Sequence, residues 1–119
     1  MATTGTNIIT ERVRDSLNDT STQTNVQRWS DTLLLRLLND AETMIVSLRP
    51  DALLAADGSV LTITPLTGIG QNINLGDKWA LAIHRYICQM ALSMPGKGRL
   101  NINASNHFKG LFEGLIKSL

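Results

Sequence analysis

The sequence predicts a mainly α-helical fold: a small bundle of about four helices, with one short β-hairpin inserted between the second and third helices. Three observations lead to this prediction. Apolar residues recur at three- and four-residue spacing in separate stretches, which is typical of amphipathic helices. Between residues 51 and 75 this period gives way to β-branched runs and turn residues. The length of 119 residues fits one domain, so residues 1–119 are treated as a single helical domain.

The first predicted helix spans Thr6–Asn18. Ile9, Val13 and Leu17 recur every four residues and form a narrow apolar stripe, and Thr6 is placed to cap the helix. Residues 18–25 are all polar, and their short side chains compete for backbone hydrogen bonds, so they are predicted to form a loop. Residues 1–25 are compatible with either an ordered or a mobile state in the isolated chain.

The second predicted helix, Ser30–Leu48, has the clearest pattern. Ser30 or Asp31 caps its N-terminus, and Pro50 ends it because the residue before a proline is pushed out of helical geometry. Its apolar residues follow one another at three- and four-residue spacing: Leu34, Leu37, Leu38, Ala41, Met44, Ile45 and Leu48.

The predicted hairpin consists of the strands Val60–Thr64 and Gln71–Leu75. Asp57-Gly58 is a strong turn dipeptide, the first run is β-branched, and the second alternates polar and apolar residues. Because an isolated hairpin is marginal in water, we expect it to lean on the helices or to pair with a neighbouring chain.

The third predicted helix spans Asp77–Ser93 and is stopped by Pro95-Gly96; the last spans Asn103–Lys117. Each carries an apolar face. The face of the third helix comprises Trp79, Ala82, Ile83, Tyr86, Ile87, Met90 and Met94, and that of the last comprises Phe108, Leu111, Phe112, Leu115 and Ile116.

Composition excludes several classes of protein. The net charge of +1 argues against a protein that coats nucleic acid by charge alone. The single cysteine excludes an intramolecular disulfide framework, and no apolar run approaches the ~20 residues of a membrane span. The N-terminal residues lack the features of a signal peptide, so an intracellular domain is expected. The charge is uneven: residues 77–119 carry six Lys and Arg against two acids, whereas residues 51–76 carry two Asp and no base.

The residues that could carry chemistry have simpler interpretations. His84 and Cys88 lie four apart on one helix face, but a zinc site needs more ligands, so we expect a surface histidine beside a buried thiol. Among the acids of the second helix, Asp31 and Asp40 are more than two turns apart, and Asp40 and Glu42 do not face each other. A helix cap and a solvated face explain these three acids. We therefore predict no catalytic, cofactor or metal site, and no enzyme.

Over most of residues 26–112, the sequence resembles the head-to-tail adaptor (connector, or head-completion) proteins of tailed bacteriophages. The second helix and its end carry the first part of the resemblance, and the third and last helices carry the rest. The stretches are Trp29-Ser30-Asp31, Leu38-Asn39-Asp40-Ala41-Glu42, Val46-Ser47-Leu48-Arg49-Pro50-Asp51-Ala52, Gly76-Asp77-Lys78-Trp79-Ala80, Tyr86 with Met90-Ala91 and Pro95, and Asn103-Ala104 with His107-Phe108. Members of this family often carry a longer β-rich insertion before the third helix, whereas here Leu75 passes almost directly into it.

The resemblance implies a structural virion protein, assembled in the host cytoplasm, that forms a ring of about a dozen copies on the portal. Such a ring extends the DNA channel used in genome packaging and ejection, and it offers a surface to the tail or nozzle protein. Double-stranded DNA would pass without specific binding, and no membrane or cofactor is implied. The residues expected at subunit or partner interfaces are Val60, Leu61, Ile63, Ile73, Lys97 and Arg99.

A second hypothesis is a small helical DNA-binding or regulatory module. The basic, glycine-spaced loop Lys97–Arg99 and the positive C-terminal region favour it. The absence of a tight helix–turn–helix spacing ranks it below the adaptor hypothesis.

Overall fold

The computed structural model describes residues 3–13, 16, 30–55, 57–93 and 102–119. Within these ranges the protein is mainly helical, as the sequence predicts. The elements are α1 (Gly5–Ile8), a π-helix (Ile9–Val13), α3 (Asp31–Leu48), a 3-10 helix (Pro50–Leu53), a 3-10 helix (Asp77–Trp79), α4 (Ala80–Leu92) and α5 (Ile102–Ser118).

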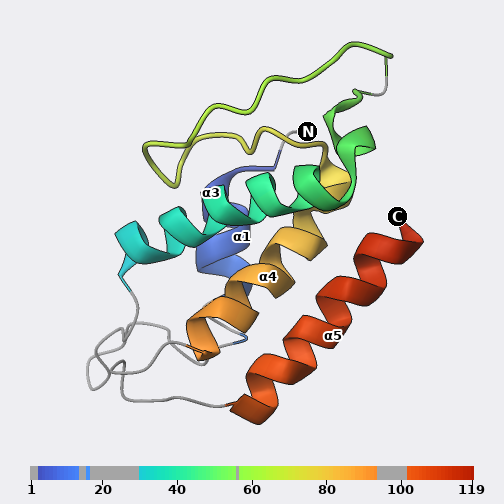
Figure 1. Ribbon diagram of the computed structural model, residues 1–119. Coiled ribbons are helices and arrows are strands. Elements are labelled where there is room, and N and C mark those ends of the chain that lie inside the picture. The colour runs from blue at the N-terminus through green and yellow to red at the C-terminus, as the bar shows by residue number, and fades with distance from the viewer. Residues whose placement is uncertain (1–2, 14–15, 17–29, 56, 94–101) are drawn as a thin grey trace.

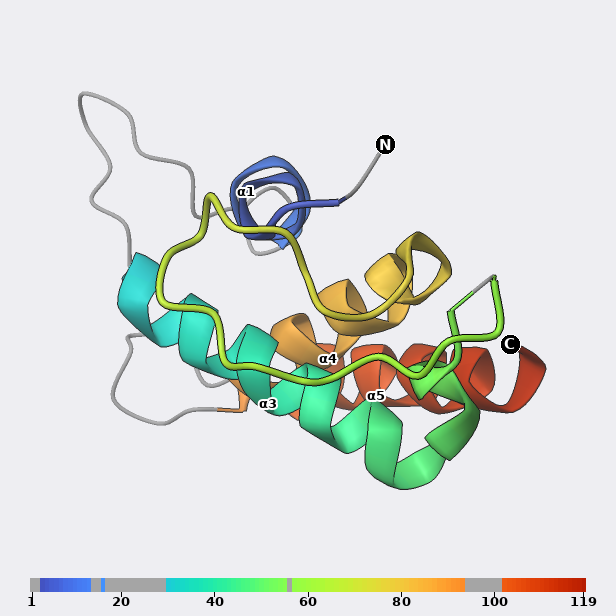
Figure 2. The ribbon, with the colours of Figure 1, turned by 90° about the horizontal axis from the view of Figure 1, so that it is seen from above.

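The helix α4 forms the centre of the bundle. It packs against α3 on one side and against α5 on another, and α1 and the π-helix also contact it (Figure 1). We call residues 3–13 and Ser16 the N-terminal segment. Seen from above, this segment lies on the opposite side of α4 from α5 (Figure 2). The largest fully buried side chains come from the N-terminal segment, α3, the 3-10 helix before α4, and α4: Ile8, Ile9, Val13, Leu34, Leu38, Glu42, Ile45, Trp79, Ile83 and Ile87.

The ends of the predicted second helix are confirmed. Ser30 caps α3, because its side-chain hydroxyl accepts a hydrogen bond from the Leu33 N–H at 3.1 Å. The helix ends at Leu48, two residues before Pro50. The third helix opens with a 3-10 turn before α4, and α5 agrees with the predicted last helix to within one residue at each end.

The predicted cap of the first helix is wrong. The cap is Thr4, whose hydroxyl accepts from the Asn7 N–H at 3.2 Å while the Asn7 side chain accepts from the Thr4 N–H at 3.0 Å. The hydroxyl of Thr6 is used elsewhere, in a hydrogen bond to the Ile69 carbonyl at 3.1 Å. The helix therefore begins at Gly5, and the predicted C-terminal part falls mostly outside the described residues.

The predicted β-hairpin is also wrong. Residues 57–76 contain no strand, and the described residues form only the isolated bridges Thr4–Asn72 and Leu54–Val60. The backbone groups that a hairpin would pair are used elsewhere. The Gln71 carbonyl accepts from the Gly5 N–H at 2.9 Å, and the Ile73 N–H donates to the Thr3 carbonyl at 2.9 Å. The second predicted strand thus pairs with the N-terminal segment instead of the first.

The turn at Asp57-Gly58 is confirmed. Gly58 has a φ of +88°, a left-handed conformation that favours glycine, and the Asp57 carboxylate accepts hydrogen bonds from the Ser59 N–H and hydroxyl. After this turn the chain runs back along α3, on the side away from α5 (Figures 1 and 2). We call residues 57–73 the arm.

Replacing Gly5 by alanine should destabilise the protein by about 1–3 kcal/mol, because the new Cβ would lie 2.6 Å from the Ile69 carbonyl oxygen of the arm. Gly110 on α5 is the matched control, since a Cβ there meets nothing within 4 Å. Gly110→Ala should stabilise the protein by up to about 1 kcal/mol. Chemical denaturation followed by circular dichroism measures both. Equal effects of the two changes would contradict the close approach of α1 to the arm.

Candidate interaction surface

Side-chain amides hold the arm in place of a strand ladder. The Thr64 N–H donates to Asn74 Oδ1 at 3.2 Å, and the Thr64 carbonyl accepts from Asn74 Nδ2 at 2.8 Å. Asn39 of α3 holds Leu66 in the same way. The Leu66 N–H donates to Asn39 Oδ1 at 2.9 Å, and the Leu66 carbonyl accepts from Asn39 Nδ2 at 3.1 Å. Each amide therefore satisfies one donor and one acceptor of an extended backbone, as a neighbouring strand would.

Glu42 of α3 anchors the end of the arm. Its side chain is 0% exposed, and its carboxylate accepts three hydrogen bonds: from the N–H of Asn74 at 2.8 Å, from the N–H of Leu75 at 2.9 Å, and from Asn74 Nδ2 at 2.9 Å. A buried carboxylate is tolerated when its oxygens are satisfied in this way. Glu42 positions Asn74, which in turn holds Thr64.

The predicted solvated face for Glu42 is therefore wrong. The sequence did contain a signal for its burial: Glu42 lies four residues after Leu38 and three before Ile45, both of which are in the core. Asp40, two residues earlier, is exposed as predicted. The acid at position 42 holds the end of the arm through hydrogen bonds.

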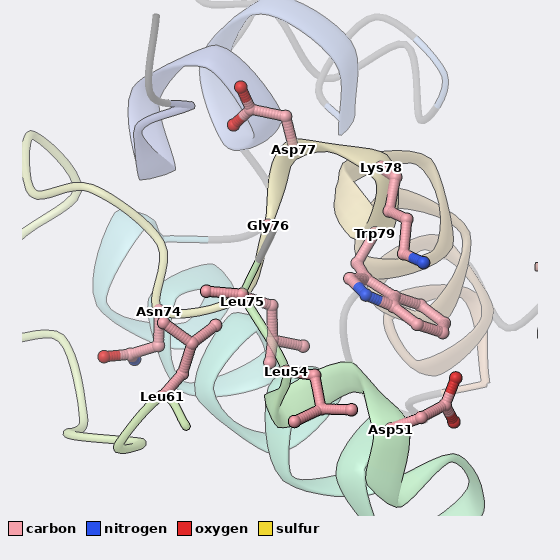
Figure 3. A pocket seen from close by; sticks show the side chains of 10 residues that line it. Asp51, Leu54, Leu61, Asn74, Leu75, Gly76, Asp77, Lys78 and Trp79 are labelled. Atoms are coloured by element: carbon pink, nitrogen blue, oxygen red, sulfur yellow. The ribbon is translucent and has the colours of Figure 1, made fainter. Parts of the chain in front are cut away.

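A groove of about 590 Å³ lies between the residues after α3 and those before α4 (Figure 3). Leu54, Leu61 and Leu75 turn toward one another at its centre. Asp51 and Lys78 stand at its rim. The complete lining is Asp51, Leu54, Ala55, Leu61, Asn74, Leu75, Gly76, Asp77, Lys78 and Trp79. An apolar floor with charged edges suits the insertion of an aliphatic side chain from a partner.

Two charged groups beside the groove form an ion pair with each other. Arg49 forms a bidentate ion pair with Asp51, at 2.9 and 2.8 Å, and this pair lowers the pKa of Asp51. Arg49 also donates to the Ile116 carbonyl of α5 at 2.6 Å and lies 5.6 Å from the Trp79 ring centroid. Arg49 thus joins the end of α3 to α5 and to the groove wall.

On the opposite rim, Asp77 accepts a hydrogen bond from the Thr3 N–H at 2.9 Å, which lowers the pKa of Asp77. The Lys78 ammonium lies 5.2 Å from the Trp79 ring centroid. Trp79 itself is buried.

The structure places the predicted interface residues in different environments. Val60 is 71% exposed at the start of the arm, Leu61 faces the groove, and Ile63 is half-buried. Ile73 is buried and packs in the core. Lys97 and Arg99 lie outside the described residues. Sequence reasoning missed Leu54, which is 57% exposed and pairs with Val60, because the fold brings residues 54 and 60 together only through the turn.

The prediction for the His84–Cys88 pair is confirmed for Cys88 and wrong for His84. Cys88 is buried, and burial raises the pKa of its thiol to about 12, so it is a poor nucleophile at neutral pH. His84 is also buried, contrary to the prediction of a surface histidine, because the N-terminal segment and α5 both reach it.

Within the described ranges, no group of three or more His, Cys, Asp or Glu side chains is placed to share a metal ion. None of the helices described is both long enough and apolar enough to cross a membrane. Comparison of the chain with protein-family models, with curated proteins and with solved structures gave no match.

Proposed function

We propose that this chain is a non-enzymatic head-to-tail adaptor of a tailed bacteriophage. In this proposal, copies of the chain form a ring on the portal, extend the DNA channel, and provide the surface to which the tail attaches. The residues that carry the family resemblance support it by their roles in the fold: Asn39 and Glu42 hold the arm, and the stretch 76–79 lines the groove.

The observation that carries the proposal is the exposed apolar surface beside the groove. Leu54 is 57% exposed and Val60 71% exposed, and the two form a bridge next to the groove floor. Contiguous exposed apolar surface, rimmed by polar groups, marks sites of protein association. A ring subunit needs such surface because each copy meets neighbours as well as the portal.

Charge is compatible with this role. A channel that DNA must slide through should not bind it tightly, and a basic lining would do so through counterion release. The chain has a net charge of +1, and α5 presents Lys109 and Lys117 together with Glu113 on exposed positions. The competing hypothesis of a DNA-binding module predicts salt-dependent retention of the protein on duplex DNA. The adaptor proposal predicts no retention even at low salt.

The direct test mixes the protein with the portal of the same phage and examines the particles by negative-stain electron microscopy. We expect an additional ring on the portal. Val60→Asp should lower the occupancy of this ring about tenfold or more, because an unpaired carboxylate would be buried in the contact.

The matched control is Asn106→Asp, which adds the same charge at an exposed position of α5. It should leave ring occupancy unchanged. Portal particles that never acquire a ring from the wild-type protein would overturn the proposal, and equal occupancy with Val60→Asp would remove the arm from the interface.

A further inference from the structure

A buried histidine lies on α4 where the N-terminal segment and α5 meet. It is His84, which is only 9% exposed. The ring Nε2 lies 2.9 Å from the hydroxyl oxygen of Ser16, which follows the π-helix in the chain. The other ring nitrogen, Nδ1, is buried and has no hydrogen-bond partner among the described residues. The adaptor function proposed above makes no use of this histidine.

The neighbours of His84 from α5 and α4 are an aromatic ring and a neutral thiol. From α5, the Phe108 ring approaches in an edge arrangement, with ring centroids 6.3 Å apart. The other histidine, His107, contacts Phe108 at 5.7 Å. From α4 itself, Cys88 lies one turn on and is neutral, since burial raises its pKa to about 12.

The charged groups that act on the His84 ring are both cations. Arg12 approaches from the π-helix and Arg85 is its neighbour on α4. Burial lowers the pKa of His84 first, and repulsion from Arg12 and Arg85 lowers it further. The main chain of Arg12 has the smallest effect and raises the pKa of His84. A proton added to the ring would therefore place a positive charge in a buried position that already faces two others.

The N-terminal segment is the element that a charge on His84 would affect most directly. It carries both Arg12 and Ser16, whereas α4 holds His84 within a continuous helix. We propose that His84 is a proton-sensitive tether: when the ring is protonated, residues 3–13 and Ser16 detach from α4 more readily, while α3 and α4 stay packed. This proposal does not depend on the adaptor function.

The direction of the pH effect follows from linkage. The ordinary pKa of histidine is about 6.5, and the docked state lowers it. The neutral ring therefore favours docking fully above pH ~6.5, and this contribution is lost as the pH falls from there toward the lower pKa of the docked state.

The test is amide hydrogen exchange by NMR at pH 7.5 and 5.5, with protection factors corrected for the intrinsic exchange rate. We expect protection at Ile8, Ile9 and Val13 to fall about five- to tenfold at pH 5.5. Protection in the centre of α3 should not change. An equal loss across α3 would overturn the proposal, because it would indicate ordinary acid destabilisation of the whole domain.

Two variants test which of the two histidines causes the pH dependence. His84→Gln should abolish the pH dependence at the N-terminal segment, and His107→Gln, at an exposed position of α5, should retain it. The same loss of protection in His84→Gln would overturn the proposal. Since His84→Gln could fail to fold, the ring signals of the wild-type protein provide a second measurement. We expect the pKa of His84 to lie below the ordinary histidine value of about 6.5, and the Val13 methyl signals to shift in the same titration. A pKa of His84 at or above that value, or Val13 signals that do not follow it, would also overturn the proposal.

Discussion

Replacing Glu42 by alanine should lower the free energy of unfolding by about 3–5 kcal/mol. The substitution removes the acceptor of three hydrogen bonds and leaves the N–H groups of Asn74 and Leu75 without partners in a buried place. It should also release Asn74 Nδ2, so the hold of Asn74 on Thr64 weakens. Chemical denaturation followed by circular dichroism measures the loss.

Two further variants make this prediction specific. Glu42→Gln keeps one carbonyl oxygen for the two backbone donors and loses the bond to Asn74 Nδ2, so we expect an intermediate cost of about 1–2 kcal/mol. Asp40→Ala removes a carboxylate two residues away at an exposed position and should change stability by no more than about 0.5 kcal/mol. If Glu42→Ala were as mild as Asp40→Ala, the buried carboxylate would not anchor the arm.

Replacing Trp79 by alanine should cost about 3–5 kcal/mol, because the indole is among the largest fully buried side chains. The ring also forms one wall of the groove and lies beneath the cations of Arg49 and Lys78. Its removal should therefore disturb the groove as well as the core. Thermal and chemical unfolding of the variant measure the cost.

Lys78→Ala is the matched control for Trp79. It removes an exposed cation from the same ring and should cost about 0.5–1 kcal/mol. Trp79→Phe keeps an aromatic ring and should fall between the two. A loss for Trp79→Ala no greater than that for Lys78→Ala would show that the groove wall is not part of the core.

The helices could be predicted because their signals are local. The spacing of apolar residues in α3, its Ser30 cap and the proline after it are all read within one stretch of chain. The start of the N-terminal helix was predicted wrongly, because Thr6 is not the cap. Thr4 takes that role through its reciprocal hydrogen bonds with Asn7, and Thr6 bonds to the distant Ile69.

The arm could not be predicted because its partners are distant side chains. The runs 60–64 and 71–75 have strand-like composition, and by propensity alone they should pair with each other. Asn39 lies 27 residues from Leu66, and Glu42 lies 32 residues from Asn74. Nothing in a local pattern distinguishes an asparagine that replaces a neighbouring strand from one in an ordinary loop. Tertiary context thus overrides propensity here.

The groove depends on the same long-range contacts. Its lining comes from Asp51, Leu54, Ala55 and Leu61 and from residues 74–79, which are brought together by the turn at Gly58 and by the hydrogen bonds of Glu42 to Asn74. Val60 and Leu61 could be named from the sequence as candidate interface residues of the predicted hairpin. Their joint position with Leu54 at the edge of a groove could not.

The most direct test of the central claim is a cryo-electron microscopy reconstruction of the portal carrying this protein. The adaptor proposal predicts a closed ring in which Leu54, Val60 and the groove are covered by a neighbouring copy or by the portal. A ring in which these residues all remain exposed to solvent, or a portal with no added ring, would contradict it.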